Sequence, residues 1–289
     1  MNFREKLKSK KFIITSEIGP PKGVDIEKYL ADADEIKGKI DAINVTDLQS
    51  SVMRLGSLAF SHLLLKRDIE PIFQMTCRDR NRLALQSDLL SAYVLGIRNV
   101  LMLTGDHPTL GDHPQAKGVY DLDSVSLLKA AKGLEEGEDM AGKKLKGAPH
   151  FCLGAAVNPG AEPLEPEIIK MKKKIEAGAK FFQTQAVFDI ELFRNFMEQV
   201  KGINASIIAG IVVLKTAGTA RFMNEHVPGV FVPDCIIDEM DRAEDKSQKS
   251  IEIAVRFIEE IKGLVSGVHI MTIGMHEKVP ILLEKIRNL

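Results

Sequence analysis

Short apolar runs rich in β-branched and aromatic residues recur along the whole chain at a nearly constant spacing. Eight such runs can be counted, and the first four begin roughly 29 residues apart. Turn residues bound them, so each is predicted to be a buried strand. The runs are FIITSEI from Phe12, DAINVTD from Asp41, EPIFQMT from Glu70, RNVLMLTGD from Arg98, FCLGAAV from Phe151, KFFQTQA from Lys180, SIIAGIV from Ser206 and GVHIMTI from Gly267.

The segments between these runs have the apolar periodicity of amphipathic helices. Examples are DIEKYLADADEIKG, RLALQSDLLSAYVLG and EPEIIKMKKKIEAGA, and several end near a glycine, which favours the end of a helix. A strand followed by a helix and a second strand requires parallel pairing through right-handed crossovers. Eight such units predict an α/β fold, a single (β/α)8 TIM barrel that occupies residues 1–289 as one catalytic domain.

Two intervals, 105–150 and 227–250, are too long for a simple crossover and are predicted to contain elaborated loops together with a helix. The rival fold is a doubly wound open sheet. Such a sheet normally carries a glycine-rich phosphate turn after its first strand, and neither GxGxxG nor GxxxxGK[ST] occurs in the sequence. We therefore favour the barrel.

The composition argues against several classes of partner and site. The 39 basic and 40 acidic residues nearly cancel and form no basic stripe, so no nucleic-acid partner is expected. The basic start of the chain leads into a strand, and no apolar run reaches the length of a bilayer span, so we expect a cytoplasmic protein without membrane association. Cys77, Cys152 and Cys235 form no CxxC, so neither a disulfide framework nor a zinc or iron–sulfur motif is predicted.

Polar residues that follow the strands are the candidate functional residues, because in a βα barrel they face the mouth where the loops gather. The first cluster is SEIGPP, in which Glu17 ends a buried strand and the rigid Gly-Pro-Pro exit holds it in place. A carboxyl group among apolar neighbours has its charged form disfavoured, so Glu17 can stay protonated and act as a general acid. The alternative is a strand-end glutamate that only caps a loop.

The second cluster is LTGDHP, which contains Gly105 and a second mouth acid, Asp106. Gly105 would let a flat ligand approach the backbone closely. A second Gly-Asp-His-Pro follows at 111–114, and the two histidines and two aspartates raise the possibility of a metal site. The intervening prolines and the lack of helical i, i+4 placement argue against that site, so no metal is predicted.

Three further segments carry polar or basic side chains. QMTCRDRN follows the third strand, and its Cys77 is predicted to be inert packing. In QTQ on the sixth strand, alternation places Gln183 and Gln185 on one face, and two inward amides suit the donor and acceptor edge of a heterocycle. The basic run from Lys170 to Lys174 is either a solvated helix face or a contact to an anionic cofactor.

Taken in chain order, SEIGPP, INVTD, QMTCRDRN, LTGDHP, GVYDLDS, GAAVNP, GAKFFQTQAVFD and GVHIMTIG resemble the methylenetetrahydrofolate reductase family. The resemblance runs through nearly the whole chain, and its segments fall at predicted strand ends. It implies a flavin-dependent enzyme of one-carbon metabolism, in which reduced FAD passes a hydride to methylenetetrahydrofolate and gives methyltetrahydrofolate. A flavin-free pterin-binding or methyltransferase barrel is the alternative.

The resemblance also implies roles for single residues. Glu17 matches the acid that protonates the bridging nitrogen of the folate, and Asp106 matches the acid beside the flavin and the pterin. Gln185 matches the amide that contacts the folate ring, and Gln183 is a second expected substrate contact. The expected FAD contacts, in which Lys174 would supply charge to a phosphate, are Thr46, Gln74, Thr76, Thr104, Gly105, Asp106, Tyr120, Ala156 and Lys174.

Three positions differ from bacterial members of the family that use NADH. Gln74 stands where some of those members have histidine, and the aromatic and arginine that they carry near Ala217 and Met275 are absent. Without a ring to stack on a nicotinamide, direct use of NADH is in question. The motifs are closest to members from acetate-forming anaerobes, which often work with an iron–sulfur partner subunit. We expect either NAD(P)H or, as our hypothesis, such a partner as electron donor, and we expect an oligomer.

Overall fold

Parallel strands close into a barrel in the computed structural model, which describes residues 1–9 and 11–286. Within these residues each strand pairs with its neighbours in chain order, and the last strand pairs with the first. The predicted (β/α)8 barrel is confirmed. Its strands are β1 (Ile13–Ile18), β2 (Ala42–Val45), β3 (Pro71–Thr76), β4 (Asn99–Leu103), β5 (Cys152–Val157), β6 (Phe181–Ala186), β7 (Ser206–Val212) and β8 (Gly267–Met271).

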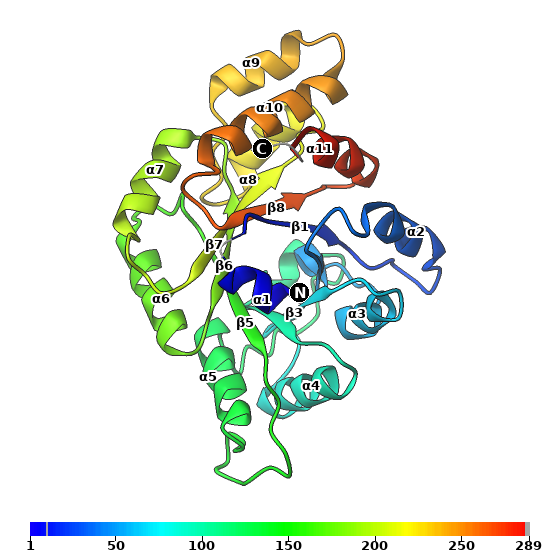
Figure 1. Ribbon diagram of the computed structural model, residues 1–289, viewed down its shortest axis with the longest axis vertical. Helices are drawn as coiled ribbons and strands as arrows, with labels where there is room; N and C mark the ends of the chain where they lie inside the picture. The colour runs from blue at the N-terminus through cyan, green and yellow to red at the C-terminus, as the bar shows by residue number, and fades with distance from the viewer. Residues whose placement is uncertain (10, 287–289) are drawn as a thin grey trace.

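Helices connect successive strands and surround the barrel (Figure 1). The connecting helices are α2 (Glu27–Ile36), α3 (Ser57–Leu65), α4 (Arg82–Val94), α5 (Ser124–Glu135), α6 (Glu165–Glu176), α7 (Ile190–Gln199) and α10 (Lys246–Ile261), and α11 (Val279–Ile286) follows β8. Additional helices α8 (Ala217–His226) and α9 (Asp234–Arg242) precede α10, so the predicted helix in 227–250 is confirmed. Short 3-10 turns η1 (Gln49–Ser51), η2 (Pro108–Leu110) and η3 (His276–Lys278) follow β2, β4 and β8.

Polar side chains at the helix N-termini determine where the loops of the barrel mouth end. Asn81 accepts hydrogen bonds from two backbone N–H groups at the start of α4, and Asp123 accepts one at the start of α5. Asp189 and Asp245 cap α7 and α10 in the same way. Each cap satisfies backbone donors that have no partner inside the helix. The loops between the strands and these helices are therefore held at both ends.

The amino-terminal end of the barrel is filled with apolar side chains and closed by α1 (Phe3–Lys8). The Phe3 ring packs edge-on against Phe181 of β6, with ring centroids 5.3 Å apart. Gly154 on β5 makes room for Phe181, because a Cβ at this position would lie 2.2 Å from that ring. This floor is a packed core. A ligand of the barrel interior must therefore enter from the carboxyl ends of the strands.

Outward-facing strand residues pack against the helices and form the main core, to which β1 contributes Ile18 and β3 contributes Phe73. A separate apolar cluster lies beneath α8 and α9 and includes Ala217, Met223 and Ile236. In the part of the chain that the structure describes, no helix combines the length and the apolar character needed to cross a bilayer.

We expect Phe3→Ala to lower the free energy of unfolding by about 3 kcal/mol, because it removes a fully buried ring from the barrel floor. Phe12→Ala is the matched control, since the Phe12 side chain is 38% exposed and its loss should cost about 1 kcal/mol or less. Urea denaturation of the two variants measures the difference. Similar losses in both would show that α1 does not close the floor.

Candidate active site

A layer of hydrogen-bonded polar side chains crosses the barrel interior directly above the apolar floor. Asn44 of β2 and Gln183 of β6 exchange amide hydrogen bonds of 2.6 and 3.1 Å, although their strands are not neighbours. Gln183 also donates to Thr15 Oγ1 at 3.4 Å, and Thr15 Oγ1 lies 3.0 Å from Nδ1 of His269. These contacts cross the barrel, so all four side chains point inward. The layer satisfies polar groups that would otherwise be costly to bury.

Glu17 lies two residues beyond Thr15 on the same face of β1 and therefore closer to the mouth. Its side chain is almost buried, and Oε2 lies 3.6 Å from Nε2 of His269 on the adjacent strand β8. The chain leaves the strand through Gly19, Pro20 and Pro21. An inward, nearly buried carboxyl group at the mouth is placed to exchange a proton with a bound molecule.

Asp106 lies in the loop after β4 and is held by its backbone. Its carbonyl oxygen accepts hydrogen bonds from Ser51 Oγ at 2.9 Å, Tyr120 Oη at 2.9 Å and Arg78 Nη1 at 3.3 Å. The Asp106 side chain is exposed, and among the described residues its carboxylate accepts no hydrogen bond. Three donors thus fix the position of the residue and leave the carboxylate available to a ligand.

Gly105, Thr104 and Thr76 form one side of the mouth. Gly105 has φ +92°, and a Cβ at this position would lie 3.1 Å from the Cβ atoms of Thr76 and Arg78. Both the left-handed backbone and the close packing therefore favour glycine. Thr104 Oγ1 accepts a hydrogen bond of 3.3 Å from the backbone N–H of Ser124 at the start of α5. Gly105 thus lets the loop after β4 pack closely against Thr76 and Arg78.

Asp47, a residue of INVTD to which the sequence analysis gave no role, organises this side of the mouth. It is buried and accepts hydrogen bonds from the backbone N–H of Thr76 at 2.8 Å and from the Thr76 hydroxyl at 2.9 Å. It also accepts one from Ser57 and pairs with Arg80. Asp47 thus holds the end of β3 against the loop after β2. The signal that the sequence offered for Asp47 was an acid directly after a predicted strand.

Two expected cofactor contacts, one directly after β2 and one on β3, lie on the inward face. Thr46 directly follows β2, and its hydroxyl oxygen is a buried polar atom with no hydrogen-bond partner in the described residues. Gln74 of β3 is almost buried and shares the inward face with Ile72 of the floor. A buried hydroxyl without a partner is costly. Thr46 is therefore suited to a polar atom of a bound molecule.

Lys174 is the inward member of the basic run on α6, whereas Lys170, Lys172 and Lys173 are exposed. Its Nζ donates a hydrogen bond of 2.6 Å to the backbone carbonyl of Ala156 on β5. Burial lowers the pKa of Lys174 from 10.5 to about 8, and the nearby Glu167 opposes that shift. A nearby anion stabilises the charged form of a buried ammonium group that is hydrogen-bonded to a carbonyl. Lys170, Lys172 and Lys173 thus form the solvated face of the run, and a contact of Lys174 with an anionic cofactor stays a prediction.

The two expected amides of β6 lie in different surroundings. Gln183 is buried, and both N–H donors of its amide are used within the barrel, by Asn44 and Thr15. Gln185 is exposed, and the pairing of β6 with β7 shifts register between Gln183 and Ala186. Of the two amides, Gln185 is the exposed one, and because of the register shift alternation alone does not place it on the face of Gln183. A substrate contact through the N–H groups of Gln183 would have to replace an existing hydrogen bond.

The second Gly-Asp-His-Pro connects the loop after β4 to the loops after β1 and β2. Asp112 pairs with Lys22 and His113 and accepts a hydrogen bond of 3.0 Å from the backbone of Met53, and the contacts with Lys22 and His113 lower the pKa of Asp112. His107 bonds to Thr109. In the described residues no group of three or more His, Cys, Asp or Glu side chains is placed to hold a metal.

Cys77 is buried, and burial raises its pKa to about 12, as expected of a packing residue.

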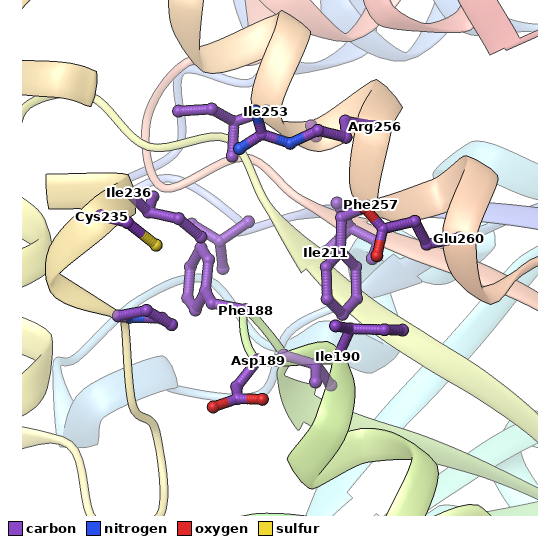
Figure 2. A pocket seen from close by; sticks show the side chains of 14 residues that line it. Phe188, Asp189, Ile190, Ile211, Cys235, Ile236, Ile253, Arg256, Phe257 and Glu260 are labelled. Carbon is purple, nitrogen blue, oxygen red and sulfur yellow. The ribbon is translucent and has the colours of Figure 1, made fainter. Parts of the chain in front are cut away.

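A pocket of about 250 Å³ lies outside the barrel between α7, α9 and α10. Figure 2 shows Phe188, Ile236 and Phe257 facing this pocket, with Arg256 and Glu260 extending from α10. None of the expected site residues lines it. The chemistry of Glu17 and Asp106 therefore places the candidate active site at the barrel mouth and not in this pocket.

Comparisons with known proteins agree with the barrel and identify its relatives. A family model described as methylenetetrahydrofolate reductase matches residues 2–287. Methylenetetrahydrofolate reductase 2 of Saccharomyces cerevisiae is 27% identical over 239 residues, which cover 76% of this chain and 37% of the yeast protein. The 5,10-methylenetetrahydrofolate reductase of Pectobacterium carotovorum is 29% identical over 208 residues, or 69% of this chain and 63% of that protein. This chain thus spans only part of the length of these relatives.

A solved structure from Clostridium thermocellum has the same fold, with a TM-score of 0.67 and 19% identity over 99% of this chain and 98% of that one. It is described as an uncharacterized protein that binds two copies of 5-methyl-5,6,7,8-tetrahydrofolic acid.

The lowered pKa of Lys174 predicts a pH-dependent stability. Between about pH 8 and 10.5 the unfolded chain keeps the Lys174 proton and the folded chain loses it, so the stability of the ligand-free protein should rise with pH across this window. In the wild type we expect the free energy of unfolding to rise by on the order of 2 kcal/mol across this window, and Lys174→Met should remove this rise. Urea denaturation at several pH values measures it, with the exposed Lys173→Met as control. An equal rise in both variants would contradict the assignment.

Proposed function

The chain belongs to the methylenetetrahydrofolate reductase family, and from this premise we propose that it reduces methylenetetrahydrofolate to methyltetrahydrofolate with FAD as its cofactor. The observation that carries the proposal is the inward, nearly buried carboxyl group of Glu17 at the mouth of a barrel that the family model matches from residue 2 to 287. The reaction needs a proton donor at this place. The folate bound by the Clostridium thermocellum protein supports the substrate class.

The residues at the mouth fit FAD, which when bound would supply the hydride. Thr46 offers a buried hydroxyl without a partner among the described residues, and Gly105, which is partly exposed, offers its backbone. Lys174 offers a buried ammonium group that would face a phosphate better than it faces the carbonyl of Ala156. The remaining expected contacts, which we also propose, are Gln74, Thr76, Thr104, Asp106, Tyr120 and Ala156.

We assign Glu17 the proton transfer. It donates a proton to the bridging nitrogen of the folate, the bond between this nitrogen and the methylene carbon breaks, and the resulting iminium carbon accepts the hydride to become a methyl group. The electron pair of the broken bond stays on the nitrogen. The support in this chain is the position of Glu17 above the polar layer, where the packed floor excludes water from below.

Asp106 and Gln185 are assigned to the pterin. The free carboxylate of Asp106 would stabilise the cationic iminium, and three donors hold the backbone that carries it in place. The exposed amide of Gln185 would bind the donor and acceptor edge of the ring. Gln183 would support Gln185 from the layer below.

For the electron donor we propose an iron–sulfur partner subunit in preference to direct reduction by NAD(P)H. The support is Ala217, which is 3% exposed and packs in the apolar cluster beneath α8 and α9. Apolar packing thus occupies the position near which NADH-using members carry their aromatic residue. That this chain forms an oligomer also stays a prediction.

The proposal expects Glu17→Gln to keep bound flavin and its reduction by dithionite, because neither needs the proton donor. Reoxidation by methylenetetrahydrofolate should slow about 100- to 10,000-fold. Anaerobic stopped-flow absorbance follows both half-reactions, with the exposed Glu27→Gln as control. If both half-reactions slow equally, Glu17 does not have this role. A protein purified without flavin absorbance would favour a flavin-free pterin-binding or methyltransferase barrel.

The donor proposal expects NADH and NADPH to bleach the flavin of the isolated chain slowly, because the chain lacks a stacking ring at Ala217. Dithionite should bleach the same sample at once, which shows that the flavin is reducible. Rapid bleaching by either nucleotide in an anaerobic stopped-flow experiment would refute the need for a partner.

A further inference from the structure

His269 lies in the middle of β8 with its ring inside the barrel and 3% of its side chain exposed. One ring nitrogen, Nε2, is 3.6 Å from Oε2 of Glu17, and the other, Nδ1, is 3.0 Å from the hydroxyl of Thr15. On the opposite side, β7 places Gly210 at the register position beside His269 and so adds no side chain there. Both ring nitrogens therefore face β1.

The hydrogen bonds of the polar layer determine which nitrogen of His269 carries the proton. The Gln183 amide donates to Thr15 Oγ1, so the Thr15 hydroxyl hydrogen is free to point elsewhere. It can point to the carbonyl of Val268 at 3.4 Å or to Nδ1 of His269 at 3.0 Å, and the shorter contact is the stronger one. Nδ1 is then an acceptor, and a neutral His269 carries its hydrogen on Nε2, which faces Glu17.

From this chain of contacts we propose that His269 is a positioning residue for Glu17: the Asn44–Gln183–Thr15 relay fixes its Nε2–H tautomer, and the positive end of that N–H, whose nitrogen lies 3.6 Å from Oε2, electrostatically favours the carboxylate left after proton donation. The inference rests on the function proposed for Glu17. His269 keeps its own proton throughout, so the proton that reaches the folate nitrogen comes from Glu17 alone. Among the described residues, Glu17 is the titratable group that contacts the His269 ring.

The tautomer can be measured without substrate or cofactor turnover. Two-bond ¹H–¹⁵N NMR spectra of the protein labelled at its 7 histidines distinguish a protonated from an unprotonated ring nitrogen, and His269→Gln identifies the resonance. We expect a single Nε2–H form near neutral pH in the wild type. Thr15→Val should mix in the Nδ1–H form. Ser16→Ala is the matched control, because it removes a buried hydroxyl of the same strand that bonds to Ile270 and not to His269.

The effect on Glu17 is measured in the folate half-reaction of dithionite-reduced enzyme. We expect His269→Leu to slow reoxidation by methylenetetrahydrofolate about 10- to 100-fold while flavin reduction is unchanged. His269→Gln, which keeps an N–H donor, should restore much of the rate. In His269→Leu the loss of rate at high pH should begin at a higher pH than in the wild type, because the Glu17 carboxylate has lost a neighbouring N–H that favoured it.

The outcomes separate this inference from the proposed function. A wild-type enzyme that does not reoxidise with methylenetetrahydrofolate refutes the proposed function, whereas the NMR result still tests the relay. A wild-type Nδ1–H tautomer overturns the inference. A pH profile of His269→Leu identical to that of an active wild type overturns the inference as well. If His269→Leu does not fold, Thr15→Val is compared with Ser16→Ala in the same two measurements. Equal results for these two variants would overturn the inference.

Discussion

The amide pair between Asn44 and Gln183 crosses the barrel interior, and the rest of the site depends on it. A buried amide without partners costs free energy, and these two side chains largely satisfy one another across strands that do not touch. Below them the barrel is apolar and closed by Phe3, whereas Glu17 and Thr46 lie above them toward the mouth. The pair thus marks the depth at which the packed core ends and chemistry becomes possible.

The loops above this layer are joined by backbone contacts, which leave the reactive side chains free. The carbonyl of Asp106 accepts from residues of three different loops, and Asp112 connects the same loop to Lys22 and Met53. Leu48, Ser50 and Ser51 adopt positive φ, a conformation that non-glycine residues hold only when their surroundings impose it. This strain lies where Ser51 reaches Asp106. The mouth is thus preorganised before a ligand arrives.

Strand spacing predicted the barrel because period and length decide which segments can pair, and the alternation along β1 and β6 predicted which face Glu17 and Gln183 occupy. Periodicity says nothing about depth or partners. The partner of Gln183 is Asn44, 139 positions away, and only the closed sheet brings them together. For the same reason the sequence did not reveal Asp47 as an anchor, the second Gly-Asp-His-Pro as a connection between loops, or His269 beside Glu17.

The burial of Lys174 has a thermodynamic consequence for any anion that binds beside it. With a pKa of about 8 in the ligand-free protein, part of the population carries no charge at mildly alkaline pH. An anion favours the charged form, so binding must draw protons from the buffer, and its affinity must fall as the pH rises above that value. The heat of binding then depends on the ionisation enthalpy of the buffer. One lysine facing inward on α6 would thereby couple the binding of an anion beside it to proton uptake.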